Sequence, residues 1–207
     1  MRIVVALDER TLLKSGAFEV SESRSTNVQA VARALADLAQ DHQVIVAHGN
    51  GLQENLLTMQ TAACLSDGLS NIEMLLTETE GMIGYLIEQE LLNALPEGAD
   101  LATIVTRIEV DRNDPAFDKP TNAVGPSFSA ACAKIMQDQH GWTMAGNAQG
   151  RLSRMIPSPL PRAPLSSRMI EQLADSGACV ICSGGGRPVF RNEAGMMEGV
   201  AAIVDKD

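Results

Sequence analysis

Short apolar runs alternate with amphipathic stretches along most of this chain. Three runs rich in β-branched residues predict strands, at 2–7, at 43–48 (QVIVAH) and at 101–110, and the first two are typical of strands buried within a sheet. Three stretches place apolar residues on one helical face, at 24–40, 52–65 and 79–94. Pro96 and Gly98 end the last of these helices. Such alternation of strands and helices predicts parallel pairing in an α/β sandwich.

The pattern changes between Asp111 and Pro126, where Asp, Asn, Pro and Gly replace the apolar periodicity. Beyond it the sequence predicts a short helix at 127–139, a hairpin from 142–144 and 152–156, and an extended return at 157–164. We interpret 112–163 as a subdomain that protrudes from the main sheet. The last predicted elements are a helix at 166–176 and strands at 178–182 and 200–204.

Composition narrows the possible partners. The chain has 207 residues and a formal net charge of −10, which argues against nucleic-acid or anionic-membrane binding because both need a basic surface. A local anion site remains possible, since backbone N–H groups bind phosphate without side-chain charge. No apolar run approaches the roughly 20 residues of a membrane span. The four cysteines show no framework spacing, which favours a reducing cytoplasm.

Two glycine turns follow predicted strands and are candidate phosphate sites. Gly49, Asn50 and Gly51 follow His48, and Gly184, Gly185 and Gly186 follow Ser183. Ligands of open α/β sheets bind outside the carboxyl ends of the strands, where both turns are expected. Each turn also has a plainer interpretation, as a tight strand–helix connection or a flexible loop. His48 is a candidate site residue or a packing residue.

Other candidate groups have structural interpretations. Cys179 and Cys182 form a C-x-x-C pattern, but residues three apart in a strand point to opposite faces, which disfavours a shared metal. The carboxylates of the helix at 79–94 and just before it predict a solvated face: Glu78, Glu80, Glu88 and Glu90. No metal site is expected.

Several segments, in order, resemble the carbamate kinase family of the amino-acid kinase superfamily: VIVAHGNG at 44–51, EGMIGYLIEQEL at 80–91, TRIEVDRNDPAF at 106–117, PSPLPR at 157–162, VICSGGG at 180–186 and AIVDKD at 202–207. The resemblance implies a three-layer sandwich with a mostly parallel central sheet and a small protruding subdomain at about 112–163. It also implies phosphoryl transfer between ATP and carbamate, with Mg²⁺, in a homodimer. By the same resemblance, both glycine turns line the carbamate and phosphate site. Lys206, beside Asp207, stabilises charge on the moving phosphoryl group.

This chain departs from the family at the expected site. Asp8, Glu9 and Arg10 stand where the family has a phosphate-cradling Gly-Gly-Asn turn. Two like charges about 4 Å apart cost about 4 kcal/mol at an effective dielectric constant of 20, and each 1.4 kcal/mol or so is tenfold in rate. The replacement therefore predicts a severe loss of catalysis.

Two further departures concern charge and bulk near the same site. The neutral Asn122 replaces a family lysine, and Lys119 lies three residues earlier. Arg187 directly follows the second glycine turn and adds a large side chain near a loop that is bare in the family. The resemblance also implies that the family's nucleotide-binding part lies beyond Asp207, so that this chain spans the carbamate and phosphate side.

Three hypotheses stay open from the sequence. The first is an active carbamate kinase, either by itself or completed by a separate chain. The second is a non-catalytic relative that keeps the fold and acts as a binding or regulatory partner. The third is a small-anion binder without turnover. A dimer is expected by analogy, through the helices at 52–65 and 79–94, although their apolar residues are equally suited to packing on their own sheet.

Overall fold

A parallel four-stranded sheet forms the centre of the molecule. The computed structural model describes residues 1–12, 22–49, 72–146, 150–183 and 187–204. The strands are β1 (Arg2–Leu7), β2 (Gln43–His48), β3 (Leu101–Ile104) and β9 (Cys179–Ser183), in the spatial order β1-β2-β9-β3. All three pairings are parallel, which confirms the predicted α/β class.

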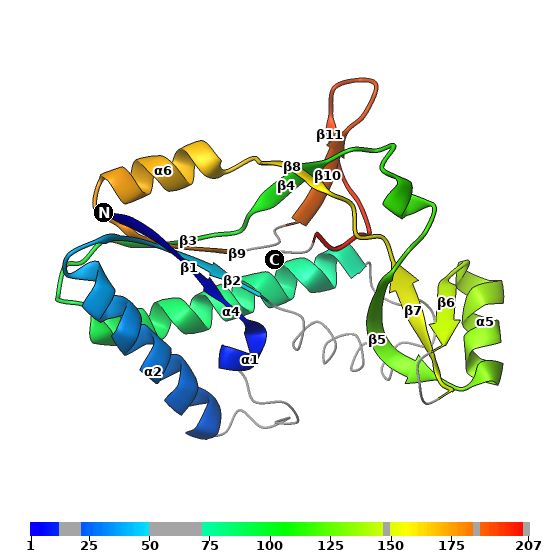
Figure 1. Cartoon of the computed structure of the whole chain (residues 1–207), viewed down its shortest axis with the longest axis horizontal. Coiled ribbons are helices and arrows are strands. Elements are labelled where there is room, and N and C mark those ends of the chain that lie inside the picture. Colours follow the sequence, from blue (N-terminus) through cyan, green and yellow to red (C-terminus); the bar gives the residue numbers. More distant parts are fainter. Residues whose placement is uncertain (13–21, 50–71, 147–149, 184–186, 205–207) are drawn as a thin grey trace.

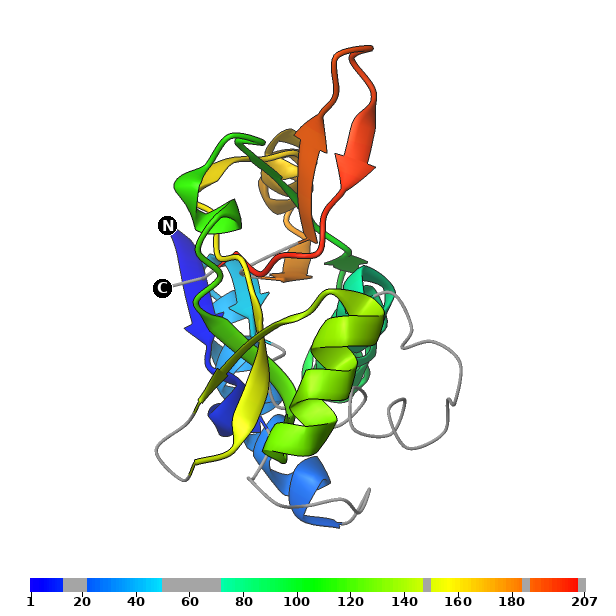
Figure 2. The same cartoon turned by 90° about the vertical axis from the view of Figure 1, so that its right-hand side faces the viewer.

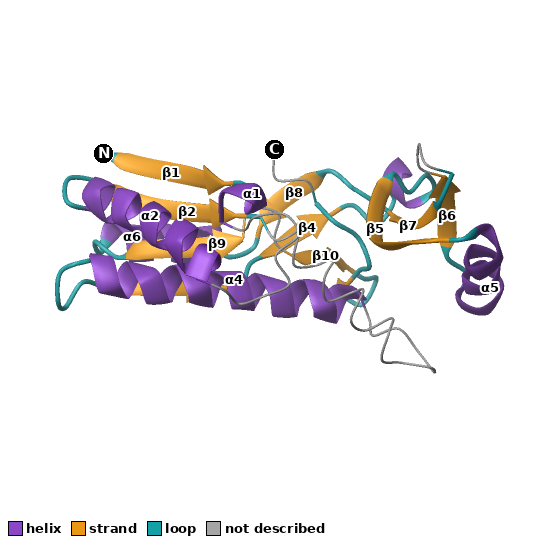
Figure 3. Ribbon diagram, turned by 90° about the horizontal axis from the view of Figure 1, so that it is seen from below, coloured by secondary structure: helices purple, strands orange, loops and turns teal. Residues whose placement is uncertain are grey.

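Helices cover both faces of this sheet. The helices are α1 (Glu9–Leu12), α2 (Glu22–Ala39), α4 (Ile72–Ala94) and α6 (Ser167–Asp175). Helices α2 and α4 lie on one face and α6 lies on the other (Figures 1 and 3). Leu35 of α2 and Ile87 of α4 pack with Val46 in one core cluster, and Ala174 of α6 packs with Val180 in another. The result is the predicted three-layer arrangement.

The first strand is less buried than its sequence predicts. Its residues alternate between exposed and half-buried until Leu7, and the Val4 side chain is 63% exposed. The strand ends the spatial order of the sheet, and α6 packs on β2 and β9. The prediction of burial on both faces is therefore wrong for β1, because position in a sheet decides burial and the residue types do not.

The run at 101–110 is two strands rather than one. Leu101–Ile104 pairs with β9 in the central sheet, whereas β4 (Arg107–Val110) pairs with β10 in a second sheet. The break falls at Thr106, whose backbone N–H donates to Glu80 Oε1 at 2.7 Å. The Glu80 carboxylate on α4 therefore accepts the hydrogen bond that this N–H would donate to a neighbouring strand if the strand were continuous.

The second sheet contains β4, β8 (Pro161–Pro164), β10 (Arg187–Arg191) and β11 (Met197–Gly199), in the order β11-β10-β4-β8. Strands β10 and β11 form a hairpin whose turn uses Gly195 at φ +80°. The predicted strand at 200–204 is wrong. Ala202 and Val204 are buried, but the backbone there bonds to irregular partners, such as Ile203 N to Pro157 O at 3.0 Å.

A third, antiparallel sheet lies at one end of the molecule with a helix beside it (Figures 1 and 3). Its elements are η1 (Pro115–Phe117), β5 (Asn122–Phe128), α5 (Ala130–His140), β6 (Thr143–Gly146) and β7 (Leu152–Ile156), and the strand order is β5-β7-β6. The predicted hairpin is confirmed as β6 and β7. Strand β5 was missed, because Gly125 and Pro126 interrupt its apolar pattern.

The helix predicted at 79–94 begins earlier, at Ile72. Met82 and Leu86, two apolar residues of this helix that could contact a second copy in the expected dimer, are half-buried. The helix predicted at 52–65 lies outside the described residues. Among the helices described here, none has the length and apolar character of a membrane span.

Candidate functional site

The carboxyl ends of the central strands meet at one edge of the sheet. Leu7 pairs with His48, and His48 pairs with Ser183. The Gly49 N–H donates to the Leu7 carbonyl oxygen at 3.0 Å. Asp8 therefore follows its strand directly beside Gly49. In a parallel sheet this edge is where ligands bind, so the fold unites two segments that the sequence separates by about 40 positions.

The other predicted site residues lie at the same edge, in the third sheet, or outside the described residues. Glu9 and Arg10 begin α1 at the same edge, whereas Asn122 starts β5 in the third sheet, where it pairs with Ile156. The remaining candidates lie outside the described residues: Asn50, Gly51, Gly184, Gly185, Gly186, Lys206 and Asp207. The described part of the edge is thus built from Asp8, His48, Gly49 and Ser183.

His48 is a packing residue beneath the turn. Its side chain is 1% exposed, and its Nδ1 lies 3.4 Å from the Gly49 carbonyl oxygen. Helix α4 comes close at Gly84, where an added Cβ would lie 3.7 Å from His48 Nε2 and 2.6 Å from Thr103 Cγ2. Burial lowers the pKa of His48 from 6.5 to about 4, and the positive charge of Arg187 adds to this effect. The imidazole is therefore neutral at pH 7.

Replacing His48 by glutamine is expected to reduce the acid sensitivity of the fold. Because the folded-state pKa is below the unfolded one, the unfolded chain gains a proton as the pH falls from 6.5 to about 4, while the folded chain stays neutral. The wild type should lose about 3 kcal/mol more than His48→Gln between pH 7 and pH 4. Denaturant unfolding at both pH values measures this, with the exposed His140→Gln as control. Equal losses in wild type and His48→Gln would contradict it.

A buried ion pair lies under the same edge. Glu80 on α4 is 1% exposed and Arg187 at the start of β10 is 5% exposed. Arg187 Nε donates to Glu80 Oε2 at 3.2 Å, while Thr106 donates to Glu80 Oε1 through its N–H at 2.7 Å and its Oγ1 at 3.0 Å. Burial raises the pKa of Glu80, and the hydrogen bonds from Thr106 and the charge of Arg187 offset part of the rise.

This pair corrects two sequence interpretations. Glu80 does not belong to a solvated helix face, although the exposed Glu78 on the same helix does. The Arg187 side chain, expected beside the glycine loop, instead turns into the interior between α4 and the sheet. The sequence did contain a sign of this pair. Arg187 comes soon after a buried strand, and a buried arginine needs a carboxylate partner. Nothing in the sequence identified that partner as Glu80 rather than Glu78.

The two cysteines of the C-x-x-C pattern are structural. Cys179 packs in the core cluster with α2 and α4, and Cys182 packs in the cluster with α6. They thus lie on opposite faces of β9, as the strand geometry predicts. Burial raises the pKa of each thiol to about 11. Among the described residues, no group of three or more His, Cys, Asp or Glu side chains could hold a metal ion.

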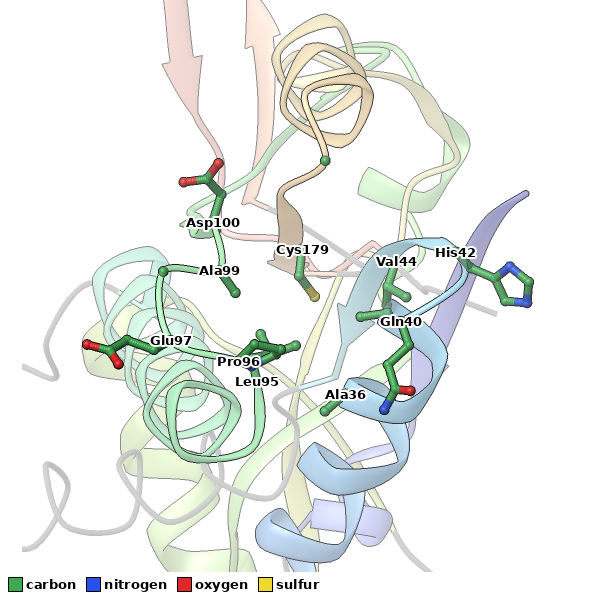
Figure 4. A pocket seen from close by; sticks show the side chains of 13 residues that line it. Ala36, Gln40, His42, Val44, Leu95, Pro96, Glu97, Ala99, Asp100 and Cys179 are labelled. Carbon is green, nitrogen blue, oxygen red and sulfur yellow. The ribbon is translucent and has the colours of Figure 1, made fainter.

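A pocket of about 410 Å³ lies at the opposite edge of the central sheet, where the strands begin. Figure 4 shows it between the ends of α2 and α4, with Ala36, Leu95 and Cys179 among its lining residues. The His42 ring points away from it in this view. Polar side chains such as Gln40, Glu97 and Asp100 line the pocket together with these apolar ones, and it is separate from the candidate site.

The parallel sheet between helical layers, with Gly49 at its carboxyl edge, is an α/β architecture consistent with the amino-acid kinase fold. The carbamate kinase of Rhizobium meliloti strain 1021 is 43% identical over 210 residues, which cover 100% of this chain and 64% of that protein. The carbamate kinase of Haemophilus influenzae is 38% identical over 208 residues, covering 100% of this chain and 67% of that protein. This chain belongs to the carbamate kinase family.

Solved structures agree with this assignment. A crystal structure of the carbamate kinase from Giardia lamblia, thiocarbamoylated by disulfiram, matches 98% of this chain and 68% of its own, with a TM-score of 0.88 and 27% identity. The Giardia lamblia enzyme bound to AMP-PNP matches 98% of this chain and 66% of its own, with a TM-score of 0.87 and 28% identity. No family model matches the sequence. The chain spans 64% to 68% of the length of the curated relatives it matches.

Proposed function

We propose that this chain is a carbamate kinase-like phosphotransferase with impaired catalysis, acting between ATP and carbamate at the carboxyl edge of the central sheet. One observation carries the proposal. The hydrogen bond from Gly49 N–H to the Leu7 carbonyl oxygen puts Asp8 beside the turn at which the family resemblance locates the transferred phosphate. A carboxylate beside the place where the resemblance locates the phosphate supports a phosphoryl-transfer site whose catalysis is impaired.

The added carboxylate explains why catalysis is impaired. Phosphoryl transfer depends on positioning and on stabilising negative charge at the phosphate oxygens. A carboxylate in this position repels the phosphate instead. Arg187 is poorly placed to offset this repulsion, because its guanidinium is already paired with Glu80 in the interior. Asn122, in place of a family lysine, adds no positive charge.

The proposal includes ATP, ADP and Mg²⁺ because of the relatives. The Giardia lamblia relative binds AMP-PNP, which supports ATP and ADP as substrates here. Mg²⁺ is usually held by substrate phosphates, waters and one or two carboxylates, so it needs no dedicated protein cage. The described residues, which include no such cage, are compatible with a metal ion that arrives with the nucleotide.

The test is ATP formation from ADP and carbamoyl phosphate with Mg²⁺, beside a Lys206→Ala variant. We expect a slow rate in the wild type that falls to background in the variant, since the resemblance assigns Lys206 to charge stabilisation. Circular dichroism verifies that both proteins are folded.

No turnover above the variant, from folded protein, would overturn the catalytic proposal. Calorimetric titration with carbamoyl phosphate would then separate the two alternatives. Binding that Lys206→Ala weakens would indicate a small-anion binder, whose support in the structure is the position of Gly49 at the carboxyl edge of the sheet. Absence of binding would indicate a relative that keeps the fold for an interaction role.

A further inference from the structure

Two chain segments form a neck between the second and third sheets. Residues 111–121 lead from β4 to β5, and residues 157–160 lead back from β7 to β8. Figure 2 shows the two segments running side by side, with η1 in the first of them. Strands β4 and β8 pair on one side of the neck, and β5 and β7 pair on the other. The orientation of the third sheet therefore depends on the bonds that join the two segments within the neck.

Prolines limit the bonds that the returning segment can make. It reads PSPL at 157–160 and runs into Pro161. Because proline has no backbone N–H, only Ser158 and Leu160 can donate a backbone hydrogen bond in this segment. A regular strand ladder, such as the one between β4 and β8, cannot continue through the neck with so few donors.

Asp114 accepts from one of these two donors. Its Oδ2 accepts from the Leu160 N–H across the neck at 2.9 Å, and its Oδ1 accepts from the Ala116 N–H at the start of η1 at 2.8 Å. These two hydrogen bonds hold the pKa of Asp114 below its ordinary value, so the carboxylate is ionised at neutral pH and both bonds are charge-assisted. We call Asp114 and its donors Ala116 and Leu160 the neck clamp.

The other polar links at the neck are weak or hold one segment only. Asp111 pairs with Arg162 of β8, but both side chains are exposed, and exposed pairs contribute little to stability. The Ile203 N–H donates to the Pro157 carbonyl oxygen at 3.0 Å, which holds the returning segment and not the first one. The neck clamp differs from both, because it joins the two segments through a backbone donor.

An apolar cluster also joins the third sheet to α4, through Val124, Ile156 and Leu76. Apolar packing is not directional, so this cluster keeps the sheet close to α4 without fixing its angle. The angle matters for the candidate site, because Asn122 starts β5 where the family has a lysine. The carboxyl ends of the central strands also point toward this end of the molecule (Figures 1 and 3).

We propose that Asp114 is a positioning residue, which through the neck clamp fixes the orientation of the third sheet relative to the carboxyl edge of the central sheet. The DPAF part of the motif at 106–117 thus acts on the neck and not on a substrate. The neck clamp itself requires no turnover, whereas its effect on the reaction rests on the proposed function.

The distance between two spin labels tests the orientation of the third sheet. Cys132 on α5 is exposed and takes one label beside that sheet, and Arg168→Cys takes the other on the exposed side of α6. Cys64→Ser in all proteins leaves these two positions for labelling, since both cysteines of β9 are buried. Double electron–electron resonance then gives the distribution of distances between the third sheet and the central sheet.

Two substitutions at one position isolate the hydrogen bond across the neck. Leu160→Pro removes the donor N–H, whereas Leu160→Ala keeps it and shortens a side chain that is 77% exposed. We expect a narrow distribution in the wild type and in Leu160→Ala, and a broader one in Leu160→Pro. Asp114→Ala should broaden it as well, and Asp118→Ala, an exposed control in the same segment, should not. Equal widths in Leu160→Pro and Leu160→Ala, from folded proteins, would overturn the proposal.

Kinetics test the effect of the neck clamp on the reaction. In the ATP-formation assay, Leu160→Pro should lower kcat about tenfold relative to Leu160→Ala, because small misplacements of groups around a site are costly. An unchanged kcat beside a broadened distance distribution would overturn the positioning role. Absence of turnover in every protein, the wild type included, would contradict the proposed function, and the label distances would still decide whether the neck clamp holds the third sheet.

Discussion

Replacing Glu80 by alanine is expected to lower the free energy of unfolding by about 3–5 kcal/mol. The substitution leaves the Arg187 guanidinium, 5% exposed, without its carboxylate. It also removes the acceptor of the Thr106 N–H at the joint between β3 and β4. An uncompensated buried charge is among the costliest defects in a folded protein, because water can no longer solvate it. Denaturant unfolding followed by circular dichroism measures the loss.

Three further variants separate charge from position. Glu78→Ala removes an exposed carboxylate from the same helix and should change stability by less than about 0.5 kcal/mol. Glu80→Gln keeps an acceptor for Thr106 and should cost less than Glu80→Ala. The double variant Glu80→Met/Arg187→Met removes both charges and should recover much of the loss. A Glu80→Ala variant as stable as Glu78→Ala would mean that the ion pair does not stabilise the fold.

Restoring the family sequence at the first turn is expected to raise the rate of ATP formation by about 100-fold or more. The variant is Asp8→Gly/Glu9→Gly/Arg10→Asn. It removes the Asp8 carboxylate beside Gly49. Because glycine has no Cβ, it also allows backbone N–H groups to approach the phosphate. The magnitude follows from a like-charge repulsion of about 4 kcal/mol at 4 Å and an effective dielectric constant of 20, discounted for solvent. The coupled assay with ADP and carbamoyl phosphate measures it.

The matched control is Asp8→Asn/Glu9→Gln, which removes both charges and keeps side chains of similar size. If repulsion limits catalysis, this control should recover a large part of the increase. If close backbone approach limits it, the control should resemble the wild type while the glycine variant is faster. A glycine variant that is folded and no faster than the wild type would contradict the assignment of Asp8 and Glu9 as the cause of impairment.

Two of the errors in strand prediction, at 101–110 and 200–204, have one physical origin. The runs at 101–110 and 200–204 are apolar enough for strands, and both contribute buried residues such as Ile108 and Val204. Apolar pattern predicts burial, but strand formation also needs a neighbouring backbone in register. Glu80 takes the N–H of Thr106 in the first run, and Pro157 accepts from Ile203 in the second. Both partners are distant in the sequence.

The sequence by itself determined the fold class, the family and the position of the Gly49 turn after a buried strand. These features depend on local periodicity and on motifs such as HGNG and RIEVDRNDPAF, which can be read without knowing any long-range contact. The opposite orientations of Cys179 and Cys182 were also predictable, since strand geometry alone decides them.

Only the tertiary structure decided that Asp8 lies beside Gly49 and that Glu80 is buried while Glu78 is exposed. Each of these facts depends on which strand or helix lies next to which, and such neighbours are set by packing between segments far apart in the chain. Burial then changes the chemistry of identical residue types, because a buried charge needs a partner and an exposed one has water. That is why the surroundings of the candidate site could be described only from the fold.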